Sequence, residues 1–371
     1  QRFFSMTNGK NQQLADLIAE HYDIGTLERH TDLPVGTVNT SYMIETSRNG
    51  VVGRYLLRLY KQGVQASEIE FEHALLNHLV AQGFDLVAPP LSARQGTSWV
   101  QCQAETDAGC RTDFYAVFRF LAGEDKYVWD NPACTLRELE SSAQVLARYH
   151  EDVSSFVPRG QRQEPRIIDF LPQIADKIET WIELGRQSSF DHLLRRYSRL
   201  IEDNINDTIR AMGIIEAGNI PELAIHCDYH PGNLKFQQGQ AIGLFDFDWS
   251  KIDYRLFDVA LALHYFCTLW RGPRDGQLHT GKLAAFLKTY QEAASENRHT
   301  GPLTSAELAC LVPMITAANI YVLNWSLVDF YTKTRDPDVY GAYLNHHIRQ
   351  IQWTQTPRNR QVLENIASIR F

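Results

Sequence analysis

The chain has 371 residues and a formal charge of −8, and its pI near 5.9 without a basic cluster argues against a nucleic-acid partner. Six scattered cysteines without a C-x-x-C pair argue against a disulfide scaffold or a zinc site and favour reduced thiols in a cytoplasmic protein. The N-terminus lacks an uninterrupted apolar core, and the most apolar later stretch, 308–323, contains Pro313, Thr316 and Asn319, so we expect neither a signal peptide nor a membrane span.

The first third of the chain carries strand patterns around one long helical pattern. Strands are expected at 40–46, 53–61, 99–103 and 114–121, and helices at 11–21 and 67–82. The turn Arg48-Asn49-Gly50 joins the first two strands. Ser67 and Glu70 form a capping-box pattern at the start of the second helix. This part of the sequence therefore predicts a small β-rich lobe.

After Ala122-Gly123 the pattern becomes mostly helical. Helices are expected at 135–153, 166–181, 191–212, 256–270, 282–293, 304–330 and 340–353. Capping boxes at Thr135/Glu138 and Thr304/Glu307 support two of these starts. The sequence thus predicts an α+β, bilobal fold, with a small β-rich lobe at 1–122 and a larger, mainly helical lobe at 123–371.

The strongest chemical signal lies in the centre of the chain. The residues H-C-D-Y-H-P-G-N at 226–233 are followed by L-F-D-F-D at 244–248. Asp228, Asn233 and Asp246 supply two carboxylates and an amide, which is the set that phosphoryl transfer requires. One carboxylate orients and deprotonates an attacking hydroxyl, while the amide and the other carboxylate hold Mg²⁺ on a triphosphate.

The segments around these residues favour a strand, a loop and a hairpin. The expected order is an apolar entry at 223–225, a strand at 233–236, a polar turn at 237–240 and a returning strand at 241–245. Such a hairpin brings Asn233 close to Asp246, and the bend at Pro231-Gly232 lets Asp228 face the same point.

The order of these residues resembles the aminoglycoside phosphotransferase and choline kinase family, a distant branch of the protein-kinase-like fold. The family pattern is H-x-D-x-x-x-x-N, an apolar strand and then D-F-D/E. It is matched in order by His226, Asp228, Asn233, Asp246 and Asp248. The resemblance implies that Asp228 is the catalytic base and that Asn233 and Asp246 bind Mg²⁺. His226 would be structural and brace the loop.

The same resemblance implies roles for residues near the motif. Asp258 resembles a buried aspartate at a helix start that accepts hydrogen bonds from the catalytic loop. Asp248 would lie near the metal or the acceptor, unless it only caps the following turn. Tyr229 and His230 would border the acceptor, with bracing of the loop as the alternative for His230. Cys227 is interpreted as a small buried filler and not as a nucleophile.

A nucleotide-binding loop is expected in the first lobe. Gly36, Asn39 and Tyr42 resemble the family pattern G-x-x-N-x-x-Y, and backbone N–H groups of such a turn would cover phosphates. A kinase-like site also requires a cation on the phosphates, held by a carboxylate on a helix. Arg58 and Glu72 are the candidates for this pair.

Other residues of the first lobe compete for these roles. Lys61 is a rival cation, but strand alternation puts it on the opposite face from Arg58, and Glu68 and Glu70 are rival carboxylates. The resemblance puts Phe120 at the position that hydrogen-bonds adenine. An ordinary core strand is the alternative for that segment.

Three classes of function follow from these patterns. The first is an ATP- and Mg²⁺-dependent kinase acting on a hydroxyl of a small amino alcohol or hydroxy amino acid such as homoserine, with an aminoglycoside or a sugar as the alternative acceptor. The second is a metal-dependent hydrolase using His226, Asp228 and His230. The third is a binding protein on an inactive kinase fold, against which the intact Asp228, Asn233 and Asp246 argue. No feature of the sequence indicates an oligomeric state or a choice between ATP and GTP.

Overall fold

The computed structural model describes residues 2–33, 38–106, 109–185, 187–217 and 220–369. These residues form two compact units. The first contains the chain up to Ala122 together with Val157–Gln161, and the second contains Gly123–Phe156 and the chain from Arg162 onwards. The chain therefore passes from one unit to the other three times. The mixture of an antiparallel sheet with many helices confirms the predicted α+β class.

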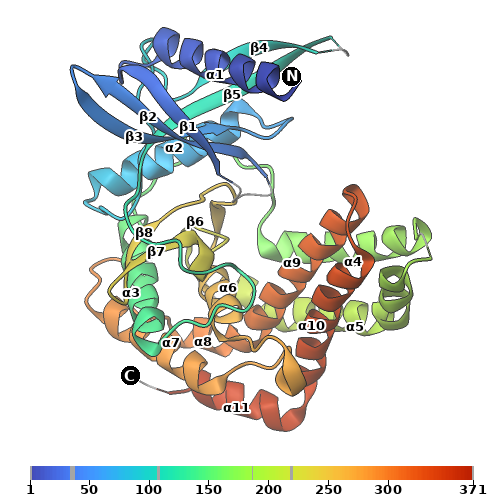
Figure 1. Cartoon of the computed structure of the whole chain (residues 1–371). Coiled ribbons are helices and arrows are strands. Elements are labelled where there is room, and N and C mark those ends of the chain that lie inside the picture. The colour runs from blue at the N-terminus through green and yellow to red at the C-terminus, as the bar shows by residue number, and fades with distance from the viewer. Residues whose placement is uncertain (1, 34–37, 107–108, 186, 218–219, 370–371) are drawn as a thin grey trace. The chain divides into compact units, whose positions relative to one another are not determined.

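The first unit is built on a five-stranded antiparallel sheet (Figure 1). In sheet order its strands are β1 (Thr26–Leu33), β2 (Thr40–Arg48), β3 (Val51–Leu59), β5 (Gly109–Arg119) and β4 (Val100–Thr106). Helix α1 (Arg2–His21) packs on one face of the sheet. Helix α2 (Ala66–Ala81) lies on the other face (Figure 1).

The β2–β3 hairpin places Arg58 in the middle of the sheet, between β2 and β5. Asn49 and Gly50 form its turn with φ angles of 52° and 79°, the left-handed values that Asn-Gly turns adopt. Because side chains alternate along a strand, Leu57 packs into the core beneath α1 while Arg58 points to α2. The predicted hairpin is confirmed, and it determines which face Arg58 occupies.

Helix α2 begins at a different cap from the one predicted. Gln65 is the N-cap residue, and its N–H donates to Glu68 Oε2 at 3.1 Å. The predicted capping box of Ser67 and Glu70 is wrong because α2 already begins at Ala66, which places Ser67 inside its first turn. The N–H of Gln161 donates to Ser67 Oγ at 2.8 Å, which anchors Val157–Gln161 to the first unit.

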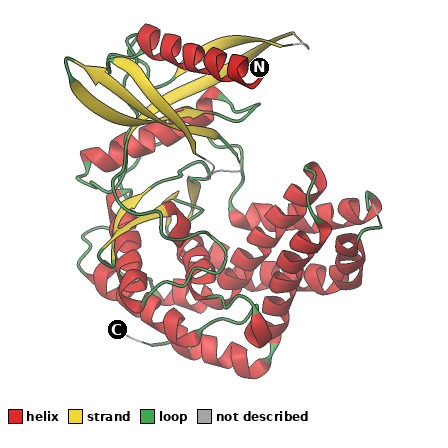
Figure 2. Cartoon of the chain, viewed as in Figure 1, coloured by secondary structure: helices red, strands yellow, loops and turns green. Residues whose placement is uncertain are grey.

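The second unit is mainly helical (Figure 2). Its described helices are α3 (Leu136–Asp152), α4 (Ile167–Glu183), α5 (Ser189–Ala217), α6 (Arg255–Cys267), α7 (Thr280–Ser295), α8 (Ser305–Ala309), α9 (Leu311–Thr332), α10 (Pro337–Gln355) and α11 (Pro357–Ala367). The described strands form two antiparallel pairs, β6 (Glu222–Ile225) with β9 (Lys251–Tyr254) and β7 (Leu234–Gln237) with β8 (Gln240–Leu244). The capping boxes predicted at the starts of α3 and α8 are confirmed.

Helix α9 forms part of the core of the second unit. Among the described residues it is the one helix whose length and composition would allow it to span a membrane, but 72% of its most apolar window is buried inside the protein. Such burial is typical of a core helix. The single helix predicted at 304–330 is divided at Cys310 into α8 and α9.

Candidate active site

The β7–β8 hairpin brings the two parts of the central motif, residues 226–233 and 244–248, next to each other. The N–H of Phe245 donates to the carbonyl oxygen of Asn233 at 3.1 Å, and His226 Nε2 lies 3.0 Å from the carbonyl oxygen of Phe245. Asp246 follows directly, with a left-handed φ of 66° that aspartate tolerates better than most residues. These bonds hold the backbone of Asp246 beside Asn233 and His226, as the predicted hairpin requires.

Asp228 is the carboxylate on which several loop residues converge. Asn233 Nδ2 donates to both the carbonyl oxygen and Oδ2 of Asp228 at 3.0 Å, and His230 Nε2 lies 3.4 Å from the same Oδ2. Burial alone would raise the pKa of this carboxyl, but His230, His226 and Asn233 hold the pKa below its usual range. The carboxylate is therefore ionised at neutral pH and can accept a proton in a transition state.

Both ring nitrogens of His226 and of His230 face other groups of the central motif. His226 Nδ1 accepts from the N–H of Asp228 at 3.3 Å, so Nε2 carries the proton that is donated to Phe245. His230 Nδ1 accepts from the N–H of Gly232 at 3.0 Å, so Nε2 carries the proton that faces Asp228. Burial lowers the pKa of His226, which favours this neutral form.

This use of the ring nitrogens contradicts the metal-dependent hydrolase. A histidine binds a metal through a ring nitrogen with an unused lone pair, and His226 and His230 have none. In the part of the chain that the structure describes, no group of three or more His, Cys, Asp or Glu side chains is arranged to hold a metal ion. The hydrolase alternative built on His226, Asp228 and His230 is therefore wrong.

Asp258 supports the loop from the first turn of α6. It is fully buried, and its two oxygens accept from the N–H groups of His226 and Cys227, each at 2.9 Å. His150 Nε2 lies 3.2 Å from Oδ2 of the same carboxylate. Cys227 has a φ of 63°, a conformation that costs about 1–3 kcal/mol for a residue with a side chain. Asp258 therefore fixes a strained backbone next to Asp228.

Asp248 lies partly exposed in the turn between Asp246 and β9. The guanidinium of Arg162 holds this turn on both sides. Its Nε donates to the carbonyl oxygen of Ser250 and its Nη2 to that of Phe247, both at 2.9 Å. The turn is thus anchored close to Asp246, whereas the place of Asp248 beside an acceptor stays a prediction.

Tyr229 does not lie where it was predicted. Its side chain is fully buried, and its hydroxyl donates to the carbonyl oxygen of Ser142 on α3 at 2.7 Å. A side chain enclosed in this way cannot border an acceptor, so that prediction is wrong.

Cys227 is also buried, and burial raises the pKa of its thiol well above the usual value. A protonated, enclosed thiol agrees with its interpretation as a filler.

In the first unit, Arg58 and Glu72 form the ion pair that was predicted. Arg58 Nη1 donates to Glu72 Oε1 at 2.8 Å, and the two side chains are 9% and 2% exposed. The hydroxyl of Tyr60 donates to the other carboxylate oxygen at 3.1 Å. The rival residues Lys61 and Glu70 are exposed. The guanidinium is therefore fixed in place, and its predicted contact with phosphate stays a prediction.

The other residues predicted for nucleotide binding are placed less completely. Asn39 Oδ1 accepts from the N–H of Lys61 at 2.9 Å, which ties the start of β2 to the end of β3. Phe120 follows the last residue of β5, and the residue is 41% exposed. Gly36 lies outside the described residues. The roles of these three residues in nucleotide binding stay predictions.

Two residues that contact the site were missed in the sequence analysis. The hydroxyl of Tyr265 donates to Asp228 Oδ1 at 3.2 Å. Tyr265 follows Asp258 by two helical turns, a spacing that puts both on one face of α6, so the position of Asp258 could have indicated it. Arg162 lies in an irregular segment, and no local pattern indicates its contacts.

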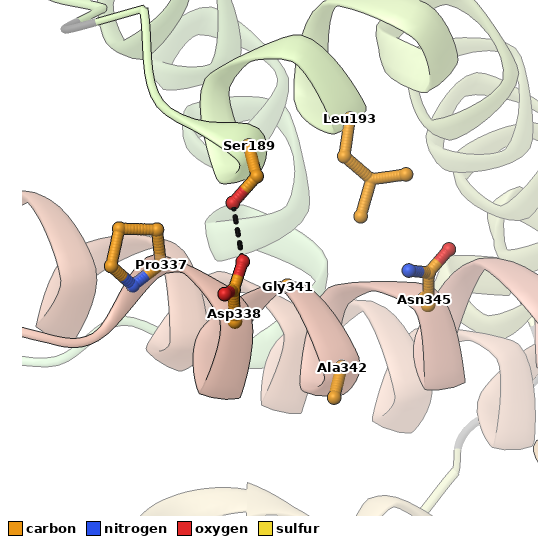
Figure 3. Close-up of a pocket in the computed structure, with 7 residues that line it drawn as sticks. All are labelled: Ser189, Leu193, Pro337, Asp338, Gly341, Ala342 and Asn345. Carbon is orange, nitrogen blue, oxygen red and sulfur yellow. Dashed lines mark hydrogen bonds between the residues drawn. The ribbon is translucent and has the colours of Figure 1, made fainter.

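A cavity of about 280 Å³ lies elsewhere in the second unit, between α5 and α10 (Figure 3). It is lined by Ser189, Leu193, Pro337, Asp338, Gly341, Ala342 and Asn345. Ser189 Oγ donates to Asp338 Oδ1 across it at 2.8 Å. Because none of the predicted site residues lines this cavity, it is separate from the motif described above.

Asn233 contacts Asp228 through its side chain and the backbone beside Asp246 through its carbonyl oxygen, and carboxylates with an amide are the residue types that phosphoryl transfer uses. Residues 30–298 match the phosphotransferase enzyme family (APH). The chain belongs to this family, and it is therefore a phosphotransferase. The predicted resemblance is thereby confirmed.

Individual relatives agree with this assignment over nearly the whole chain. A homoserine kinase from Bradyrhizobium sp. (strain ORS 278) is 26% identical over 346 residues, which cover 90% of this chain and 92% of that relative. An amicoumacin kinase solved in complex with AMP-PNP, Ca²⁺ and Ami has a TM-score of 0.64 at 19% identity and 93% coverage of each chain. A microcompartment-associated aminopropanol kinase has a TM-score of 0.63 at 17% identity, with 95% of this chain and 99% of that one covered. The two solved structures establish the fold.

Proposed function

We propose that this protein is a cytoplasmic kinase that transfers the γ-phosphoryl group of ATP, with Mg²⁺, to the hydroxyl of a small metabolite that carries an amino group. The observation that carries the proposal is the approach of Asn233 and His230 to Asp228, together with the backbone bond that ties Asn233 to Phe245, the residue before Asp246. Homoserine is the first candidate acceptor because the homoserine kinase from Bradyrhizobium is similar over 90% of the chain.

The residues of the central motif suit such a reaction. Asp228 takes the proton of the acceptor hydroxyl as the acceptor oxygen bonds to the γ-phosphorus, and the bond from that phosphorus to the β-bridging oxygen breaks to release ADP. The low pKa of Asp228 implies that its main contribution is to orient the hydroxyl, with proton transfer late in the step. Positioning is the larger part of catalysis in phosphoryl transfer.

A magnesium site fits the donor atoms of the motif. The amide nitrogen of Asn233 is used by Asp228, so the amide presents its oxygen, and Asp246 adds a carboxylate. Oxygen ligands of this kind suit Mg²⁺, which also keeps waters and phosphate oxygens. Bound there, Mg²⁺ would neutralise charge on the triphosphate.

The first unit contributes the proposed nucleotide contacts. Arg58, fixed by Glu72 at 2.8 Å, would bind phosphate oxygens through its planar guanidinium. The loop that contains Gly36 and Asn39 would lie over the phosphates, and the backbone at Phe120 would bind adenine.

The acceptor is the finer part of the proposal. Asp248 is partly exposed two residues after Asp246, and a carboxylate there favours an acceptor with an ammonium group. Homoserine and simple amino alcohols both have that group, and an aminoglycoside has several, so the aminoglycoside remains the second candidate. A neutral sugar lacks the group and is the weakest candidate.

A coupled ADP-release assay on purified protein tests the proposal. Homoserine, ethanolamine, choline, aminopropanol, an aminoglycoside and a sugar would each be offered with Mg·ATP. We expect turnover with one amine-bearing alcohol and a loss of at least about 100-fold in kcat for Asp228→Asn. Turnover that Asp228→Asn leaves unchanged would refute the assigned base, and turnover with the neutral sugar alone would refute the acceptor class.

A further inference from the structure

Tyr265 contacts the proposed base from a neighbouring helix. It lies on α6, the residue is 7% exposed, and its hydroxyl donates to Asp228 Oδ1 at 3.2 Å. On the same helix face, Asp258 accepts from the N–H groups of His226 and Cys227. One face of α6 therefore holds both the backbone that leads to Asp228 and the side chain of Asp228 itself.

The two oxygens of Asp228 have different numbers of partners. A carboxylate offers about two acceptor positions on each oxygen. Asn233 Nδ2 donates to Oδ2 at 3.0 Å, and His230 Nε2 lies 3.4 Å from the same oxygen, so two groups face Oδ2. Among the described residues, Tyr265 is the hydrogen-bond donor to Oδ1. One acceptor position on Oδ1 is left for a substrate hydroxyl.

The tyrosine is held so that it can serve only as a donor to this carboxylate. Its ring packs against His230 and His264, with ring centroids 5.1 and 5.4 Å apart. Burial and the neighbouring Asp228 raise the pKa of Tyr265 well above its usual value, so the hydroxyl keeps its proton. A donor fixed in this way opposes rotation of the Asp228 carboxylate.

We propose that Tyr265 is a positioning residue that aims Oδ1 of Asp228 at the acceptor hydroxyl. The inference rests on the proposed function, because it assigns the partner of Oδ1 to the acceptor of that reaction. Tyr265 does not touch the reacting atoms and acts through Asp228. Loss of its hydroxyl leaves the carboxylate held on Oδ2 alone, free to turn its second oxygen away.

The variant Tyr265→Phe removes the hydroxyl and keeps the ring. We expect kcat to fall by about 10- to 100-fold, the range that a small misplacement of a reacting group produces. The affinity for nucleotide, measured by titration with AMP-PNP, should stay within about two-fold, because Asn233 and the Asp246 turn are untouched. A kcat equal to that of the unaltered protein would overturn the inference.

Tyr331→Phe is the matched control. Its hydroxyl also donates to a carboxylate of the second unit, Asp191 Oδ1, at 2.7 Å, but far along the chain from the motif. This variant should keep kcat within about two-fold. An equal loss of kcat in Tyr331→Phe and Tyr265→Phe would assign the effect to general stability and overturn the positioning role.

A double-mutant cycle separates positioning from a merely structural role. If Tyr265 acts only through Asp228, then adding Tyr265→Phe to Asp228→Asn should change the residual kcat by less than about two-fold. A structural role predicts that the two losses multiply, and that result would overturn the inference.

A crystal structure of Tyr265→Phe gives a readout that needs no acceptor. We expect the Asp228 carboxylate to rotate or to occupy two orientations, whereas an unchanged carboxylate would overturn the inference. If the unaltered protein phosphorylates none of the acceptors while the carboxylate does rotate, the proposed function fails and the hydrogen-bond role of Tyr265 is retained.

Discussion

Replacement of Asp258 by asparagine tests how the catalytic loop is held. The change keeps the shape of the side chain but turns one acceptor oxygen into an NH₂ donor. Three donors point at this carboxylate, from the N–H groups of His226 and Cys227 and from Nε2 of His150. The single oxygen of asparagine accepts at most two of them, and its NH₂ group must face an N–H.

The expected cost follows from that count. One hydrogen bond to a charged acceptor is worth about 1.5–3 kcal/mol, and a buried donor left without a partner costs about 1–3 kcal/mol. Relaxation of the loop recovers part of this, because the left-handed backbone of Cys227 can return to a common conformation. We therefore expect Asp258→Asn to lower the free energy of unfolding by about 2–4 kcal/mol. The value of kcat should fall as well, because Asp228 is the next residue after Cys227 and a loosened backbone would misplace its carboxylate.

Urea unfolding followed by tryptophan fluorescence is a suitable assay. Six of the seven tryptophans lie in the second unit, which contains Asp258. Asp203→Asn on α5 is the control, because the side chain of Asp203 is 66% exposed and its loss should change stability by less than about 0.5 kcal/mol. If the two variants unfold at the same urea concentration and have the same kcat, the argument that Asp258 holds the loop is refuted.

Three further predictions concern the nucleotide, the pH and the metal. Glu72→Gln should raise the KM for ATP by about three- to ten-fold, because Arg58 loses its charged partner. The control Glu70→Gln, at an exposed position of α2, should leave this KM unchanged. Equal KM values for the two variants would contradict the role of the Arg58–Glu72 pair. Burial alone would raise the pKa of Glu151, but hydrogen bonds from the backbone and side chains of the neighbouring 299–300 turn lower the pKa to about 2. The stability from Glu151 is thus present above about pH 4.5 and lost as the pH falls toward about 2. Glu151→Gln should therefore lower the free energy of unfolding by about 1–2 kcal/mol at neutral pH and reduce the fall of the melting temperature between about pH 4.5 and 2. An equal fall of the melting temperature in both proteins over this pH range would argue against this role of Glu151. EDTA should abolish phosphoryl transfer and added Mg²⁺ should restore it, and activity that persists in EDTA would count against the metal.

Local patterns with a direct physical cause were predicted correctly. The capping boxes at the starts of α3 and α8 satisfy orphan N–H groups within four residues of chain. The hairpin that brings Asn233 to Asp246 follows from strand patterns and a polar turn. Strand alternation was enough to choose Arg58 over Lys61 as the partner of Glu72.

Features that depend on distant partners were missed. β1 is mostly exposed and lacks the apolar alternation that identifies a half-buried strand. The capping pattern at Ser67 failed because α2 begins two residues earlier, with Gln65 as the N-cap, a residue type outside the preferred caps. Tyr229 is a tyrosine beside a catalytic aspartate, and nothing in the loop indicates that α3 encloses it. Tyr265 requires the position of α6 to be known first.

The return of Val157–Gln161 to the first unit has a practical consequence for dividing this protein. A single cut at any peptide bond leaves at least one unit incomplete, because the chain passes between the units three times. A fragment that ends at Ala122 would lack the Gln161 backbone that binds Ser67 at the start of α2. Exchange of the first unit between family members would therefore have to transfer both residues 1–122 and Val157–Gln161. Sequence comparisons of that unit should likewise include Val157–Gln161.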